Sequence, residues 1–99
     1  MSKSSVERRL SQVAERLRQL RDELEVSAEQ LAHLADAADE ARLRALVSET
    51  PVADRDRRAA ERHAEAMRRH RAAVEAEIAR LERHQDELLD RLVAESGPH

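Results

Sequence analysis

The chain has 99 residues, a formal net charge of −3 and 39% charged residues, and it contains neither cysteine nor any aromatic residue. The lack of cysteine excludes disulfides, thiol chemistry and cysteine-ligated zinc. The near balance of charges selects neither nucleic acid nor an anionic membrane as a partner. A single glycine, two prolines and an abundance of Ala, Leu, Glu and Arg predict helix through most of the chain. Without aromatic side chains, we expect a ladder-like core of Leu, Val and Ala.

No apolar run is long enough to cross a membrane. The opening segment, MSKSSVERRLSQ, also lacks the apolar stretch of a signal peptide. We therefore expect a cytoplasmic location and no membrane partner. Lys3 is the only lysine among the basic residues, and this reliance on Arg suggests the GC-rich coding of a bacterial genome.

One stripe of residues organises the N-terminal half. Its members recur at alternating steps of three and four, which is the heptad spacing of a coiled-coil seam. Ser27 is the only polar member, and it could start a new helix as a capping residue. The unbroken heptad phase and the lack of a nearby Gly or Pro favour one continuous helix instead. The stripe consists of Val6, Leu10, Val13, Leu17, Leu20, Leu24, Ser27, Leu31, Leu34, Ala38, Ala41 and Ala45.

Capping signals set the predicted helix ends. Ser4 or Ser5 can cap the first helix. Thr50 followed by Pro51 has the pattern of an N-cap with proline at the first helical position, and Asp54 is an alternative cap. The predicted elements are a helix over about residues 5–47, a turn over about 48–51, a helix over about 51–94 and a frayed tail over 95–99.

A second heptad seam runs along the C-terminal helix, so the two helices are expected to fold back on each other. Long helices joined by a short turn pack antiparallel. The predicted fold is therefore all-α, a long antiparallel two-helix coiled-coil hairpin that forms one domain over residues 1–99. Ser27 is expected to lie opposite Arg71, as a polar layer that sets the register, and a turn shifted by a few residues would give a second register. The second seam consists of Ala60, Ala64, Met67, Arg71, Val74, Ile78, Leu81, Gln85, Leu88 and Leu92.

Self-association is expected because two helices alone leave the sides of their seam partly exposed to solvent. Apolar residues such as Val26, Leu89 and Val93 lie beside the seam and add to this exposure. The simplest arrangement that would bury these residues is a homodimer in which two hairpins form a four-helix bundle.

Three histidines, His63, His70 and His84, share one heptad position on the second helix. They could act as a row of pH-sensitive groups, or as metal ligands completed by a partner helix. Metal ligands on one helix usually lie one turn apart, whereas these are two turns or more apart. We therefore interpret them as polar spacers at the edge of the core and predict neither a metal site nor a cofactor.

The other polar clusters predict no chemistry. Arginines crowd residues 55–71 and could contact phosphates, but acidic residues are interleaved and no aromatic side chain can stack on bases. Nucleic acid is therefore not the expected partner. No glycine-rich loop or nucleophile with an adjacent base is present, so no catalytic residue and no enzymatic activity are predicted.

The predicted turn gathers apolar and acidic side chains into a candidate partner-binding tip. Either these residues dock on a partner, or they pack across the turn and close the end of the hairpin. Their layout resembles the coiled-coil hairpins that Gre-type and DksA-type factors present to RNA polymerase, with Asp54 and Asp56 as the acids at the tip. The Gre sequence motif is absent. The candidate residues are Leu43, Leu46, Val47, Glu49, Val52, Asp54 and Asp56.

The leading hypothesis is a non-enzymatic coiled-coil interaction protein, a small regulator or assembly adaptor that binds itself and another protein. The resemblance implies a second hypothesis, a transcription regulator that binds RNA polymerase or a sigma factor through the hairpin. A third hypothesis is a ligand- or metal-responsive helical bundle that uses the histidine row.

Overall fold

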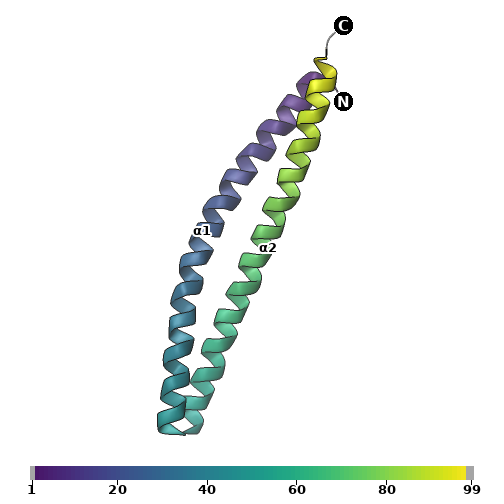
Figure 1. The fold of residues 1–99 in the computed structure, drawn as a ribbon. Coiled ribbons are helices and arrows are strands. Elements are labelled where there is room, and N and C mark those ends of the chain that lie inside the picture. The colour runs from purple at the N-terminus through teal and green to yellow at the C-terminus, as the bar shows by residue number, and fades with distance from the viewer. Residues whose placement is uncertain (1, 98–99) are drawn as a thin grey trace. The chain divides into compact units, whose positions relative to one another are not determined.

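Two long helices account for nearly all of residues 2–97, the part of the chain that the computed structural model describes (Figure 1). Helix α1 spans Lys3–Ser48 and helix α2 spans Pro51–Glu95, and no strand occurs in this described part. The predicted all-α hairpin is confirmed. Helix α1 passes through Ser27 without a break, as the heptad phase predicted.

The residue that caps the N-terminus of α1 lies two residues before the first of the predicted caps, Ser4. The Ser5 N–H donates to the Ser2 hydroxyl at 3.2 Å, and the Val6 N–H donates to the Ser2 carbonyl at 3.0 Å. Ser2 is therefore the N-cap, and the prediction of Ser4 or Ser5 is wrong. Any of the three serines could cap a helix, and the earliest one allows more backbone hydrogen bonds to form. At the other end, α2 closes at Glu95, and residues 98 and 99 of the predicted tail lie outside the described residues.

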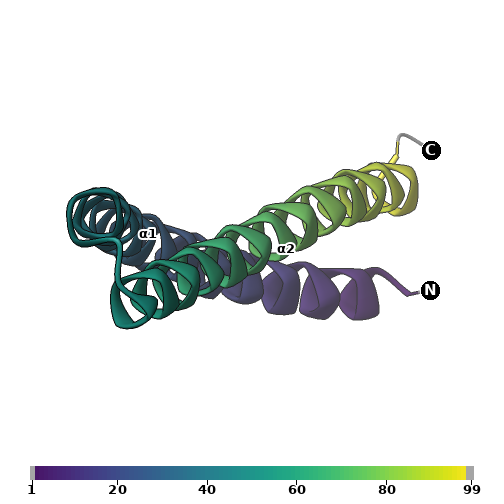
Figure 2. The ribbon, with the colours of Figure 1, turned by 90° about the horizontal axis from the view of Figure 1, so that it is seen from below.

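The connection between the helices is a two-residue turn, seen from below in Figure 2. Glu49 has a φ of 49°, and its N–H donates to the Ala45 carbonyl at 3.1 Å. This is the αL motif that commonly ends a helix. The Thr50 hydroxyl then accepts a hydrogen bond from the Ala53 N–H at 3.1 Å. Thr50 is thus the N-cap of α2, as predicted, and the alternative cap Asp54 lies inside the first turn of the helix.

Replacing Glu49 by glycine should stabilise the protein. A side chain in the left-handed region costs roughly 1–2 kcal/mol, which glycine avoids, although its more flexible unfolded chain offsets part of the gain. We expect Glu49→Gly to raise the free energy of unfolding by up to about 1 kcal/mol in chemical denaturation. Glu49→Ala removes the carboxylate but keeps the strain, so it should be less stable than the glycine variant. Equal stability of the two variants would contradict this explanation.

Contacts divide the chain into two compact units, to which each helix contributes one part. The first, here called the terminal unit, combines Met1–Glu23 with Val74–His99. The second, here called the tip unit, is Leu24–Ala73 and contains the turn.

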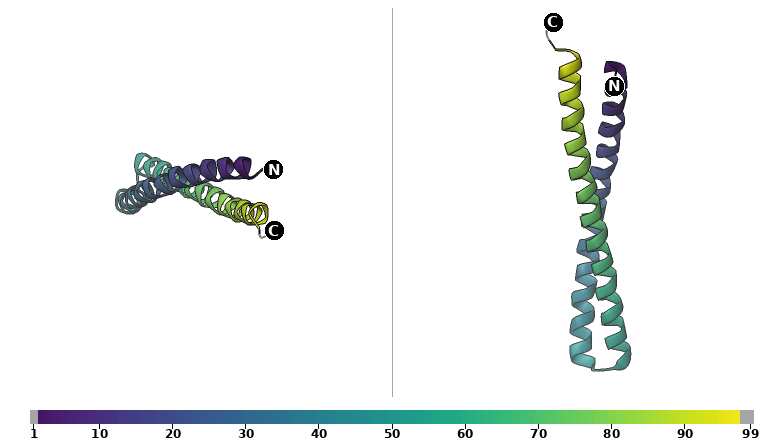
Figure 3. Two further views of the ribbon diagram at one scale, coloured as in Figure 1. Left: turned by 90° about the horizontal axis from the view of Figure 1, so that it is seen from above. Right: turned by 90° about the vertical axis from the view of Figure 1, so that its right-hand side faces the viewer.

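The terminal unit has a core of branched aliphatic residues from both helices. Figure 3 shows the start of α1 and the end of α2 running in opposite directions in this unit. Complete burial of one such side chain contributes roughly 1.5–3 kcal/mol. Arg21 and Glu82 form an ion pair across the two helices at 3.2 Å. The buried residues are Val6, Val13, Leu17, Leu20, Val74, Leu81 and Leu88.

The tip unit has a leaner core. Its two helical segments run antiparallel and meet at the turn (Figures 1 and 3). Ser27, Ala38, Ala41 and Ala64 are buried, whereas the larger seam residues are half-buried. Every position of the two predicted seams within this unit is buried or half-buried, so the heptad assignment is confirmed here. The half-buried seam positions are Leu24, Leu31, Leu34, Ala45, Ala60, Met67 and Arg71.

Candidate functional site

Large aliphatic side chains are exposed next to the turn. Leu43, Leu46 and Val47 have exposed fractions of 63%, 69% and 86%, and Val52 at the start of α2 is 59% exposed. The prediction that they could close the end of the hairpin by packing across the turn is wrong. The seam at this level is made by Ala41 and Ala45. Residues Leu43, Leu46 and Val47 lie on the sides of α1 that the seam leaves free, and we call these three residues the tip strip.

The acidic residues of the tip differ in their surroundings. The Asp54 carboxylate accepts hydrogen bonds from Arg57, at 2.8 Å from Nη2, and lies 3.2 Å from Nε of Arg58. The hydrogen bond from Arg57 is the main cause that lowers the pKa of Asp54. Arg57 also reaches Glu61 at 2.9 Å. Asp56 is exposed and takes part in no ion pair within residues 2–97.

Acidification should therefore destabilise the tip unit through Asp54. A carboxyl group with a lowered folded-state pKa adds stability above its usual pKa of 3.8, and this stability is lost as the pH falls through the folded-state pKa. We expect the melting temperature, followed by circular dichroism, to fall below about pH 4. Asp54→Asn should melt lower at neutral pH and respond less to acid. Asp36→Asn, at an exposed position without an ion pair in the described chain, is the control and should follow the wild type.

The two flanks of the seam in the tip unit carry different chemistry. On one flank, Arg42 bridges Asp39 at 3.0 Å and Glu61 of the other helix at 3.6 Å. Because Arg42 and Glu61 touch, they define one face of the hairpin, which we call the ion-pair face. It also includes the Arg68–Glu65 pair at 3.3 Å.

The opposite face follows from helical geometry. Two residues along a helix turn the side chain by about 200°, so Arg44 lies across the seam from Arg42, and His63 lies across it from Glu61. Residues one or two turns away share these positions. We call this surface the open face. It consists of His33, Ala37, Glu40, Arg44, Val52, Asp56, Ala59, His63 and His70, all exposed except the half-buried Ala59.

The three residues of the histidine row belong to different units. His63 and His70 are exposed in the tip unit, and His84 of the terminal unit has its Nδ1 atom 3.7 Å from a carboxylate oxygen of Glu87. Within residues 2–97, no group of three or more His, Asp or Glu side chains is placed to hold a metal ion. Sequence analysis did not single out His33, which lies on the same face as His63 and His70.

The predicted register layer is buried in part. Ser27 is 2% exposed, and the Nε atom of Arg71 is enclosed although its side chain as a whole is half-buried. Both residues belong to the tip unit. That they face each other stays a prediction.

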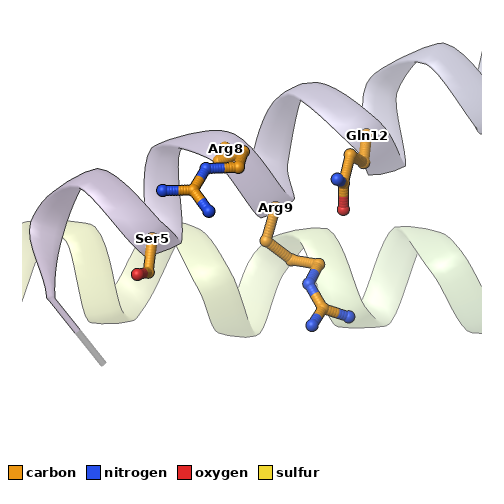
Figure 4. A pocket seen from close by; sticks show the side chains of 4 residues that line it. All are labelled: Ser5, Arg8, Arg9 and Gln12. Carbon is orange, nitrogen blue, oxygen red and sulfur yellow. The ribbon is translucent and has the colours of Figure 1, made fainter.

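Two of the surface depressions are open, and each follows a single helix. One is lined by Ser5, Arg8, Arg9 and Gln12, whose side chains leave α1 from successive turns in Figure 4. The other is lined by Glu29, Ala32, His33 and Asp36. In the described part of the chain, no helix is long and apolar enough to cross a membrane. Neither depression encloses a set of converging polar groups.

Comparisons with protein-family models, with curated proteins and with solved structures gave no match.

Proposed function

We propose that the chain is a non-enzymatic coiled-coil interaction protein, a small regulator or assembly adaptor that docks its tip strip into an apolar groove of another protein. The exposure of Leu43, Leu46 and Val47 is the observation that supports this proposal. Their i, i+3, i+4 spacing is the one by which an amphipathic helix seats its anchors in a groove.

The size of the tip strip predicts a weak and reversible complex. Burying three aliphatic side chains contributes roughly 5–9 kcal/mol in total. The loss of translational and rotational freedom on association offsets a large part of this. We therefore expect a dissociation constant in the micromolar range or weaker, since about 8 kcal/mol of net free energy corresponds to 1 μM.

The electrostatics of the tip favour apolar docking over the acidic tip of a polymerase-binding factor. Arg57 and Arg58 already neutralise Asp54, which leaves Asp56 as the unpaired member of the proposed acidic couple. A metal-responsive bundle has equally little support, because the described side chains of one copy assemble no ligand group.

Substituting the tip strip should remove the partner while leaving the helices intact. We expect the triple variant Leu43→Gln, Leu46→Gln, Val47→Gln to lose a protein that the wild-type chain captures from its native cells after crosslinking. Glutamine preserves helix propensity and these positions are exposed, so circular dichroism should be unchanged. With the purified partner, calorimetry should show affinity lowered at least about tenfold.

The matched control changes exposed aliphatic residues elsewhere. Leu89 and Val93, in the terminal unit, are 45% and 70% exposed. The variant Leu89→Gln, Val93→Gln should capture the same protein as the wild type. Loss of capture in this control with retention in the tip variant would exclude the tip strip as the docking site.

A further inference from the structure

A second surface of the tip unit, separate from the tip strip, has the properties of a self-association interface. The ion pairs of the tip unit described above gather on the ion-pair face, where Arg42, Arg57 and Arg68 are each bound to a carboxylate. The open face carries Glu40, Arg44 and Asp56, and none of these three takes part in an ion pair in the described chain. The open face therefore keeps charges that remain available to a partner.

The charges of the open face are arranged for two-fold symmetry. Arg44 lies on α1 shortly before the turn, and Asp56 lies on α2 a similar distance after it. Rotation by 180° about an axis parallel to the helices, with both turns at the same end, places α1 of one copy over α2 of the other. Arg44 of each copy then lies at the height of Asp56 of its partner. An isologous contact of this kind uses the same pair twice.

The packing surface suits close approach of a second helical layer. Ala37 and Ala59 have small side chains, so the open face protrudes little where they lie, and His63 is beside them. Small side chains let helices of a bundle approach each other, and the long side chain of Arg44 at one end can still reach the short side chain of Asp56. The seam residues Leu34 and Met67, which are only half-buried in one hairpin, would gain cover from the second copy.

We infer that the open face binds a second copy of this chain, in a two-fold symmetric four-helix arrangement that pairs Arg44 of each copy with Asp56 of the other. This goes beyond the proposed docking of another protein, because it uses different residues and needs no further component.

Charge reversal of single residues tests the interface in the purified full-length chain. Sedimentation velocity over a wide range of concentration should give twice the mass of one chain for the wild type. Arg44→Glu places two carboxylates together at both symmetric contacts, and Asp56→Arg places two cations there. For each variant alone, the dissociation constant of the homodimer should be at least about tenfold higher than for the wild type, because like charges at an interface are strongly unfavourable.

Mixing the two variants gives the decisive measurement. In a heterodimer of Arg44→Glu with Asp56→Arg, both symmetric contacts join opposite charges again, so an equimolar mixture should regain the wild-type dimer mass. An ion pair within one chain could not be restored in this way. Arg55→Glu and Asp36→Arg make the same charge changes at exposed positions outside the open face, and these controls should dimerise like the wild type.

Each other outcome overturns the inference. A monomeric wild type at all concentrations would show that the open face does not bind a second copy. Undisturbed dimers of both single variants, or a mixture that stays monomeric, would exclude the Arg44–Asp56 pairing. Because the tip-strip variant leaves the open face intact, loss of partner capture and loss of dimerisation report on the two proposals separately.

Discussion

The structure depends on the burial of one narrow stripe per helix. In each unit, the two helical segments pack against each other through a single a/d seam, and this seam carries the apolar contacts that offset the conformational entropy of folding. In the terminal unit this seam is made of Val and Leu, and its best-covered members, Val6 and Leu17, are 0% and 1% exposed. In the tip unit it relies on alanine and on Ser27, which provide less apolar area for each residue.

The turn imposes the second constraint. Helix α1 ends in a left-handed residue at Glu49, and Thr50 and Pro51 start α2 at once. No residues are left over to fold back across the end of the hairpin. Within residues 2–97, little of the chain covers Leu43, Leu46 and Val47, which explains why the tip strip is exposed.

Electrostatics then distinguish the two faces of the tip unit. Arg42 and Glu61 join the helices on one face, and Arg57 links Asp54 to Glu61 along α2. Each exposed pair of this kind contributes little stability, but the charged groups of these pairs already have partners within the chain. On the open face, Glu40, Arg44 and Asp56 take part in no ion pair in the described chain. The proposed docking of another protein uses the tip strip and the inferred self-association uses the open face, so the two proposals do not compete for the same residues.

The sequence by itself determined the elements of the fold. Heptad spacing follows directly from the helical period, so the continuous helix through Ser27 and the seam positions could be predicted from residue order alone. The local Thr50–Pro51 signal placed the start of α2 equally well, because a cap depends on neighbours within one turn. The choice of Ser2 among several possible caps could not be made in this way, since all three serines satisfy the same local rule.

The candidate surfaces depend on contacts that are made only in the folded chain. The sequence predicts Leu43, Leu46 and Val47 at the tip. It does not distinguish packing across the turn from exposure to solvent, because the outcome depends on the length and geometry of the turn. The sequence also predicts Asp54 and Asp56 as two acidic residues of the tip. The positions of the Arg57 and Arg58 guanidinium groups show that Asp54 is ion-paired, whereas Asp56 takes part in no ion pair in the described chain. Which flank of α1 shares a face with which flank of α2 follows from the Arg42–Glu61 contact across the helices, and a contact between distant residues is not encoded in any local pattern.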